Sequence, residues 1–169
     1  MEIMEAILTR RSIRKYTGKP VGEALLRELL TAAMSAPSAG DQRPWHFVVI
    51  TDRKTLDAVP RVHPYAQMLR QAPAAVLVCA ELGLEKHKGY WVQDCSAATQ
   101  NLLLAAHCKG LGAVWLGLHP VQERVAAIKK LLGLPEGVMP LSLVAIGYPA
   151  EKKLKEDRFD PARVHADKW

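Results

Sequence analysis

The sequence predicts a single domain that combines helices with a β-sheet, and three observations lead to this expectation. Its 169 residues are enough to bury one substantial core. Hydrophobic residues make up 49% of the chain and charged residues 24%, as in ordinary globular proteins. Four short apolar runs rich in strand-forming residues alternate with segments whose apolar residues recur at helical spacing.

The helical segments begin near the amino end, where Ile3, Met4, Ile7 and Leu8 predict a short helix over residues 2–10. Further helices are expected over residues 22–35, 53–59 (with Asp52 as N-cap), 66–72 and 90–109, and from Pro120 to a stop at Gly133. The second half of the 90–109 helix is apolar nearly all round, so we expect it to be buried on most sides. Gly110 is placed to cap that helix.

The four strands are expected over residues 45–51, 74–80, 112–118 and 141–146. The first reads as a central strand, and the second, a continuous apolar run, as a strand buried on both faces. Residues 35–44 form a loop by composition, with two prolines and a glycine. Its small residues would let a flat ligand approach the backbone, and ordered loops of this length are often functional.

A basic motif, Arg10-Arg11-Ser12-Ile13-Arg14, is the first candidate site. Residues 1–20 hold five Lys or Arg and two Glu, which is half of the net charge of +6. At a helix end, Arg10 and Arg14 would share a face one turn apart, and an anion between them would relieve their repulsion. Arginines at that spacing lie more often at a solvated helix end than in an anion-binding site. The local charge would suit a small anionic ligand or, less specifically, a nucleic acid.

The cysteines and histidines predict no metal site. Cys79, Cys95 and Cys108 are widely spaced and form no CxxC pair, so we expect buried thiols in a reducing compartment. None of the six histidines pairs with another His or Cys at metal-ligand spacing. No apolar run reaches the length of a membrane span, and the amino end lacks a signal-peptide pattern. A cytoplasmic protein without a membrane segment is therefore expected.

Residues 150–169 show no periodicity. They are largely charged but contain Phe159, Val164 and Trp169, and isolated large apolar residues on an arm usually pack against another surface. We therefore predict that residues 1–149 form the domain and that residues 150–169 form an extended arm that packs on a partner subunit.

Four segments, in order and at matching spacing, resemble the FMN-dependent nitroreductase family. They are residues 10–14, the loop 37–47, the turn 110–117 and the Gly-Tyr-Pro ending at 147–149. The resemblance covers essentially the whole chain. It implies an α+β, three-layer fold with a mixed, mostly antiparallel sheet flanked by helices, and a homodimer with domain-swapped arms and FMN at the subunit interface.

The resemblance also implies which residues bind the cofactor. Arg10, Arg11, Ser12 and Arg14 would hold the phosphate and ribityl chain, and Pro37, Ser38, Ala39 and Asp41 would reach the flavin from the other subunit. Leu116 and Gly117 would offer backbone N–H groups near N5, and Arg158, or else Lys155, would close the phosphate site. The chain departs from the family at Asp41, where asparagine is more usual, because a carboxylate cannot donate as an amide does.

The implied function is reduction of nitroaromatics, quinones or similar acceptors by NAD(P)H through a ping-pong mechanism. Guanidinium groups suit a phosphate, and backbone amides near N5 would stabilise negative charge on the reduced ring. No side-chain acid or base is required, and His46, His63 and His119 are expected to be structural or surface residues. The alternatives are a flavin-consuming or dehalogenating relative and, from a different class, a basic nucleic-acid-binding domain. The latter is disfavoured because the basic residues form no continuous stripe with aromatics.

Overall fold

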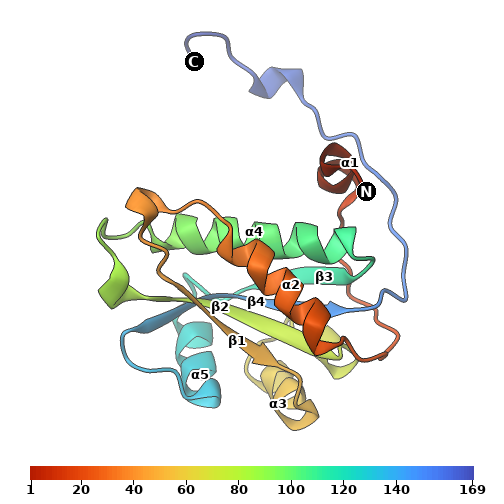
Figure 1. The fold of residues 1–169 in the computed structure, drawn as a ribbon, viewed down its shortest axis with the longest axis vertical. Helices are drawn as coiled ribbons and strands as arrows, with labels where there is room; N and C mark the ends of the chain where they lie inside the picture. Colours follow the sequence, from red (N-terminus) through yellow and green to blue (C-terminus); the bar gives the residue numbers. More distant parts are fainter.

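Residues 1–169 are described by a computed structural model in which four strands form one sheet (Figure 1). The strands are β1 (Trp45–Ile50), β2 (Ala74–Glu81), β3 (Gly112–Gly117) and β4 (Val138–Gly147), and they lie in the order β1-β2-β4-β3. All neighbouring strands pair antiparallel. A single parallel bridge joins Ser12 to Ala113 at the outer side of β3. The predicted mostly antiparallel sheet is confirmed.

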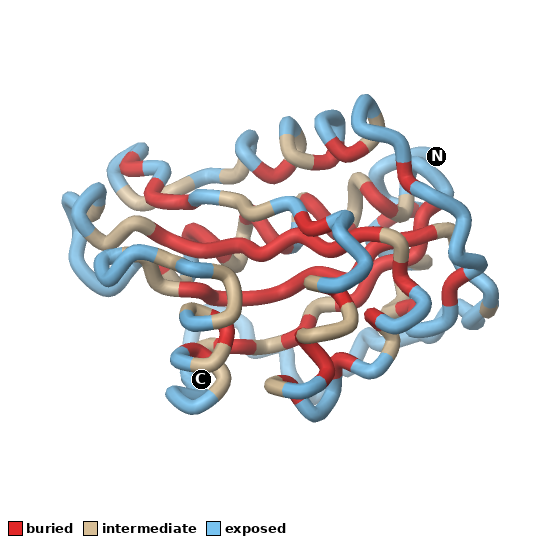
Figure 2. The backbone as a smooth tube through the Cα atoms, turned by 90° about the horizontal axis from the view of Figure 1, so that it is seen from below, coloured by how far each residue is buried: buried red, intermediate tan, exposed pale blue.

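Helices cover both faces of the sheet and make three layers. Helices α2 (Glu23–Met34) and α4 (Trp91–Cys108) lie on one face, and α3 (Arg53–Ala58) and α5 (Gln122–Leu132) lie on the other (Figure 1). Alternate residues of a strand point to opposite faces, so the sheet separates two apolar cores. Val76 belongs to the core under α4, and its neighbour Leu77 belongs to the core above α3 and α5. The buried residues run along the middle layer in Figure 2.

The position of β1 differs from the prediction. The apolar run at residues 45–51 predicted a central strand, but β1 pairs only with β2 and is an edge strand. Val49 is accordingly 39% exposed, whereas every residue of β2 before Glu81 is buried. Composition could not distinguish a central from an edge position in the sheet, because helices on both faces make even an edge strand partly apolar.

Helix ends follow their local signals in most places. The Asp52 side chain accepts from the Thr55 N–H (2.8 Å) at the start of α3. Gly110 has a φ of 73°, which lets the Leu111 N–H reach the Ala106 carbonyl (2.8 Å) after α4 ends. Two expected helices are shorter. Residues 66–72 contain only a 3-10 turn, Gln67–Arg70, and the helix after Pro120 begins at Gln122.

Helix α1 and the first part of the carboxyl-terminal arm lie side by side at one end of the molecule. Helix α1 (Ile3–Thr9) lies beyond the carboxyl end of α4, and residues 150–169 run past it and away from the body (Figure 1). The arm has one 3-10 turn, Pro161–Arg163, and exposes its large apolar side chains, with Trp169 fully exposed. No helix is both long enough and apolar enough to cross a membrane.

The three cysteines are unpaired, but only two are buried as predicted. Burial raises the pKa of the Cys79 thiol to about 11, and Cys95 lies beside it. Cys108, the last residue of α4, is exposed.

Candidate cofactor site

The basic motif is extended rather than helical. Helix α1 ends at Thr9, and Arg10 has φ −56° and ψ 128°. Arg10 and Arg14 are therefore not one helical turn apart, as the helix-end interpretation required. In an extended segment four residues span about 13 Å, and residues 10, 12 and 14 point to one side while 11 and 13 point to the other. Arg10 and Arg14 line different cavities, so the two arginines can contact the two ends of an elongated ligand.

Arg10 lies where several cations converge. A cavity of about 520 Å³ is lined by α1, Arg10, Arg11 and the arm residues Lys155–Phe159. Its lining holds four cations, Arg10, Arg11, Lys155 and Arg158, against the acids Glu156 and Asp157. Burial, then the nearby charges of Arg11 and Arg158, lowers the pKa of Arg10. The cavity therefore has an excess of two positive charges, which matches a phosphate monoester of charge about −2.

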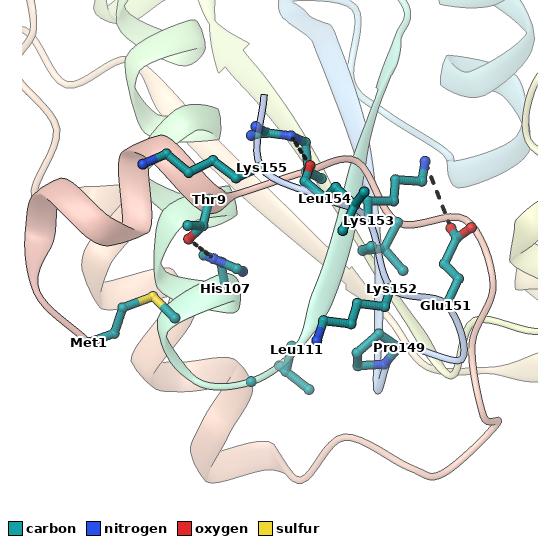
Figure 3. Close-up of a pocket in the computed structure, with 13 residues that line it drawn as sticks. Met1, Thr9, His107, Leu111, Pro149, Glu151, Lys152, Lys153, Leu154 and Lys155 are labelled. Carbon is teal, nitrogen blue, oxygen red and sulfur yellow. Dashed lines mark hydrogen bonds and ion pairs between the residues drawn. The ribbon is translucent and has the colours of Figure 1, made fainter. Parts of the chain in front are cut away.

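The arginines of this cavity differ in how they are held. Arg158 is paired with Glu156 (2.6 Å), and Arg11 donates to the carbonyls of Arg10 (2.7 Å) and Leu154 (3.1 Å). Arg11 thus ties the arm to the end of α1, and it is one of the residues that line the cavity drawn in Figure 3. The Arg10 and Arg14 guanidiniums have no protein hydrogen-bond partner. Arg10 and Arg14 are therefore the arginines free to bind an anion.

Side chains of the arm bind the backbone of the basic motif. Glu151 accepts from the N–H groups of Arg14 (2.5 Å) and Lys15 (3.2 Å). These backbone donors lower the pKa of the Glu151 carboxyl, with Lys153 adding to the effect. Lys153 in turn donates to the Ser12 carbonyl (2.6 Å). Arm residues 151–158 therefore lie against the basic motif of their own subunit before the chain leaves the body.

The end of β3 supplies a second cavity, of about 390 Å³. Gly117, Leu116, Trp115 and Arg14 line it together with His63, Tyr65, Gln67, Met68 and Arg124, and none of these residues is acidic. The Ile13 N–H donates to the Ala113 carbonyl (3.0 Å), so Ala113 faces the outer edge of the sheet. Backbone groups alternate along a strand, which turns Trp115 and Gly117 to the same edge and Leu116 toward β4. Of the two predicted donors, only Gly117 can present its N–H here.

The loop residues predicted for the flavin lie at the other end of the molecule. The Ala39 N–H donates to Asp94 Oδ1 (2.9 Å) in the first turn of α4. Thr9, just before the basic motif, contacts His107 (2.9 Å) in the last turn. Asp94 and His107 are separated by about 20 Å along the helix axis. One protomer therefore does not bring Pro37, Ser38, Ala39 and Asp41 to its own arginines.

Asp41 is engaged within its own loop. Its carboxylate forms a two-point pair with Arg43, with Nε–Oδ1 at 2.6 Å and Nη2–Oδ2 at 2.8 Å. The Arg43 hydrogen bond lowers the pKa of the Asp41 carboxyl. Asp41 and Arg43 have φ values of 53° and 45°, so the loop turns sharply on both sides of Gln42. The carboxylate is an acceptor here, as its chemistry requires.

Two residues that fix this loop were not predicted. Gln42 is buried and donates to Asp94 Oδ2 (2.6 Å), while its Oε1 accepts from the N–H groups of Lys86 and His87 (both 2.9 Å). Asp94 is also buried. A buried amide and carboxylate joined in this way are costly to leave unpaired, so they hold the loop against α4. Neither residue stands out in the sequence, because Gln42 lies in a polar loop and Asp94 lies in the first turn of a helix.

The fold and site define a class of protein. A three-layer α+β domain with a cation-rich cavity, a bare strand edge nearby and a small-residue loop matches a binder of a phosphorylated flat cofactor. Comparison with known proteins agrees. The model of the Nitroreductase family matches residues 7–64 and 58–148. The chain belongs to the nitroreductase family, a family of oxidoreductases, as the sequence predicted.

Individual relatives cover the whole chain. A Methanothermobacter thermautotrophicus protein provisionally named NADH dehydrogenase/NAD(P)H nitroreductase is 53% identical over 100% of this chain and 88% of its own length. An FMN-dependent nitroreductase from Clostridium difficile superposes with a TM-score of 0.91 at 27% identity, covering 98% of this chain and 99% of its own. A Desulfovibrio desulfuricans nitroreductase-family structure in complex with FMN has a TM-score of 0.86 at 30% identity, covering 100% and 98%. The predicted fold is confirmed.

Proposed function

We propose that this protein is an FMN-dependent NAD(P)H oxidoreductase. The observation that carries the proposal is the excess positive charge around Arg10, continued by Arg14 to the open edge at Gly117. An alanine Cβ at Gly117 would meet no atom within 4 Å, so the glycine is not needed for packing and leaves room for a flat ring. Relatives named FMN reductase and FMN-dependent nitroreductase support the same cofactor.

The residues have distinct roles in this proposal. Arg10, with Arg11, Ser12 and Arg158 around it, binds the phosphate, and Arg14 reaches the ring end. The Gly117 N–H, which faces the cavity at the end of β3, would stabilise the negative charge that develops on the flavin ring on reduction. FMN held by these residues would supply hydride transfer from NAD(P)H to an acceptor such as a nitroaromatic or quinone, with donor and acceptor using the same pocket in turn. The chain needs no side-chain acid or base for this.

The active form in this proposal is a homodimer. Each site takes Arg10 and Arg14 from one subunit and residues 37–41 from the other, because the two sets lie at opposite ends of α4. The exposed Leu154, Phe159, Val164 and Trp169 of the arm supply an apolar surface for the partner. Three unpaired thiols fit a reducing compartment, and we propose a cytoplasmic location.

Reconstitution tests the cofactor and the mechanism together. Purified protein mixed with FMN and desalted should be yellow, and anaerobic NADH or NADPH should bleach it. Initial rates with a quinone or a nitroaromatic should give parallel double-reciprocal lines. A protein that retains no flavin would contradict the proposal, and intersecting lines would contradict the ping-pong order.

Subunit complementation tests the shared site. An Arg10→Ala, Arg14→Ala subunit and a Pro37→Glu subunit should each bind FMN poorly, since each damages both sites of its own dimer. After denaturation and refolding together, random pairing should restore about a quarter of the wild-type FMN sites, because half of the dimers are mixed and each has one intact site. If both variants fold but the mixture recovers no FMN binding, the arginines and the 37–41 loop must act in a site of the same subunit.

A further inference from the structure

We infer that His63 and Arg124 are positioning residues that hold the end of β3 so that the Gly117 N–H faces the edge cavity. Both donate to the same atom, the Gly117 carbonyl oxygen, from His63 Nε2 at 3.1 Å and from Arg124 Nη1 at 3.2 Å. We refer to His63 and Arg124 as the Gly117 clamp. The clamp belongs to the folded chain, while its effect on flavin rests on the proposed function.

The tautomer of His63 is set by its surroundings. The Tyr65 N–H approaches His63 Nδ1 (3.3 Å), so Nδ1 accepts and Nε2 carries the proton that is donated to Gly117. His63 is 1% exposed, and burial lowers its pKa, with the nearby charge of Arg124 acting in the same direction. Because Nδ1 accepts a hydrogen bond, the imidazole is neutral and its Nε2 is a fixed donor.

Arg124 is the charged member of the clamp. It lies in the first turn of α5, and its guanidinium is 5.2 Å from the centroid of the Tyr65 ring. The tyrosine ring thus restricts the arginine on one side while Gly117 binds it on the other. No acidic residue lines the cavity, so the charge is not neutralised by a neighbouring carboxylate there.

A clamp is useful at this position because a glycine at a strand end has no side chain to fix it. Gly117 turns its N–H and C=O to the same edge of β3, so holding the carbonyl keeps Gly117 in the extended strand conformation in which its N–H also faces that edge. A donor that is already oriented stabilises developing negative charge without reorganising. The guanidinium adds a positive charge on the same side. Reduced flavin should therefore gain more from the clamp than oxidised flavin.

The experiment compares variants of Arg124 with a matched control on the same helix. Lys129 also lies on α5 and also donates to a carbonyl, that of Glu136 (2.7 Å), but it does not line the cavity. For Arg124→Gln, the ratio of affinities for reduced and oxidised FMN should fall about tenfold, on the order expected for a charged hydrogen-bond donor. Arg124→Lys should recover part of the ratio, and Lys129→Gln should leave it unchanged.

A second readout examines the clamp without flavin. In apo-protein, His63→Phe and Arg124→Gln should both shift the amide NMR resonances of Gly117 and Leu118. Both variants should also speed the hydrogen exchange of these amides. His63→Gln keeps a donor and should shift the resonances less. Unchanged resonances, or an unchanged affinity ratio in flavin-loaded Arg124→Gln, would overturn the inference. If wild-type protein bound no FMN, the proposed function would fail, and the apo-protein spectra would still test the clamp.

Discussion

The two ends of α4 carry the two halves of the proposed site and are built in opposite ways. At the amino end, Gln42 and Asp94 are buried and fully paired, and they fix the loop that follows α2. At the carboxyl end, Arg10 has no partner, its pKa is lowered, and the nearby His107 has a lowered pKa as well. The paired end provides stability, and the unpaired end keeps charge available for an anion. Changes at the first end should therefore affect folding, and changes at the second should affect binding.

The largest effect is expected for Asp94→Ala. It removes the acceptor of the Ala39 N–H and of the Gln42 amide, which are left unpaired at a buried position. The free energy of unfolding, measured in urea, should fall by about 3 kcal/mol. Asp57→Ala, which breaks an exposed i,i+4 pair with Arg53, is the control and should cost less than about 1 kcal/mol. Equal losses would show that the Gln42–Asp94 pair has no special role.

Arg10→Ala should have the converse effect. Because its guanidinium binds no protein group, the urea midpoint should stay near wild type, while the FMN dissociation constant rises about 10- to 100-fold through lost charge-assisted hydrogen bonds. The exposed Arg61, replaced by alanine, serves as the control and should change neither quantity. FMN retained as tightly as in the wild type would refute the phosphate assignment.

The free energy of unfolding should also depend on pH, in part through His107 at the carboxyl end of α4. Burial, then Arg10, lowers the pKa of His107, and burial lowers that of His63. The unfolded chain then binds more protons than the folded one, so stability is full above about pH 6.5 and falls as the pH drops below it. His107→Gln should remove part of that slope, by less than about 1 kcal/mol between pH 7 and 5. Urea titrations at several pH values measure it, and an unaltered slope would assign the effect to His63 or elsewhere.

The smallest effect is expected for Asp41→Asn. The Asp41–Arg43 pair is well exposed, so the urea midpoint should not change measurably. Loss of a negative charge on the loop should tighten FMN binding by only about twofold at low salt, and salt should abolish the difference. A change of tenfold or more, measured by fluorescence titration, would mean that Asp41 contacts the flavin directly.

Local sequence was sufficient for much of the fold and for naming candidate site residues. Strand β2 is buried on both faces as its apolar run predicted, and Asp52 and Gly110 cap their helices as expected. The arginines and the loop could be named because their residue types and order match a family. Arg124 and His63 gave no such signal, since a lone arginine on a helix and a lone histidine in a loop have many roles.

What the sequence alone determined is the set of elements, because caps, turns and apolar periodicity act over a few neighbouring residues. Tertiary structure decided the rest. It put β1 at the edge of the sheet, made residues 10–14 extended, and turned Gly117 rather than Leu116 outward. It also set the arginines and the loop at opposite ends of α4. These outcomes depend on which strands pair and which backbone groups remain unpaired, and such contacts join residues far apart in the chain.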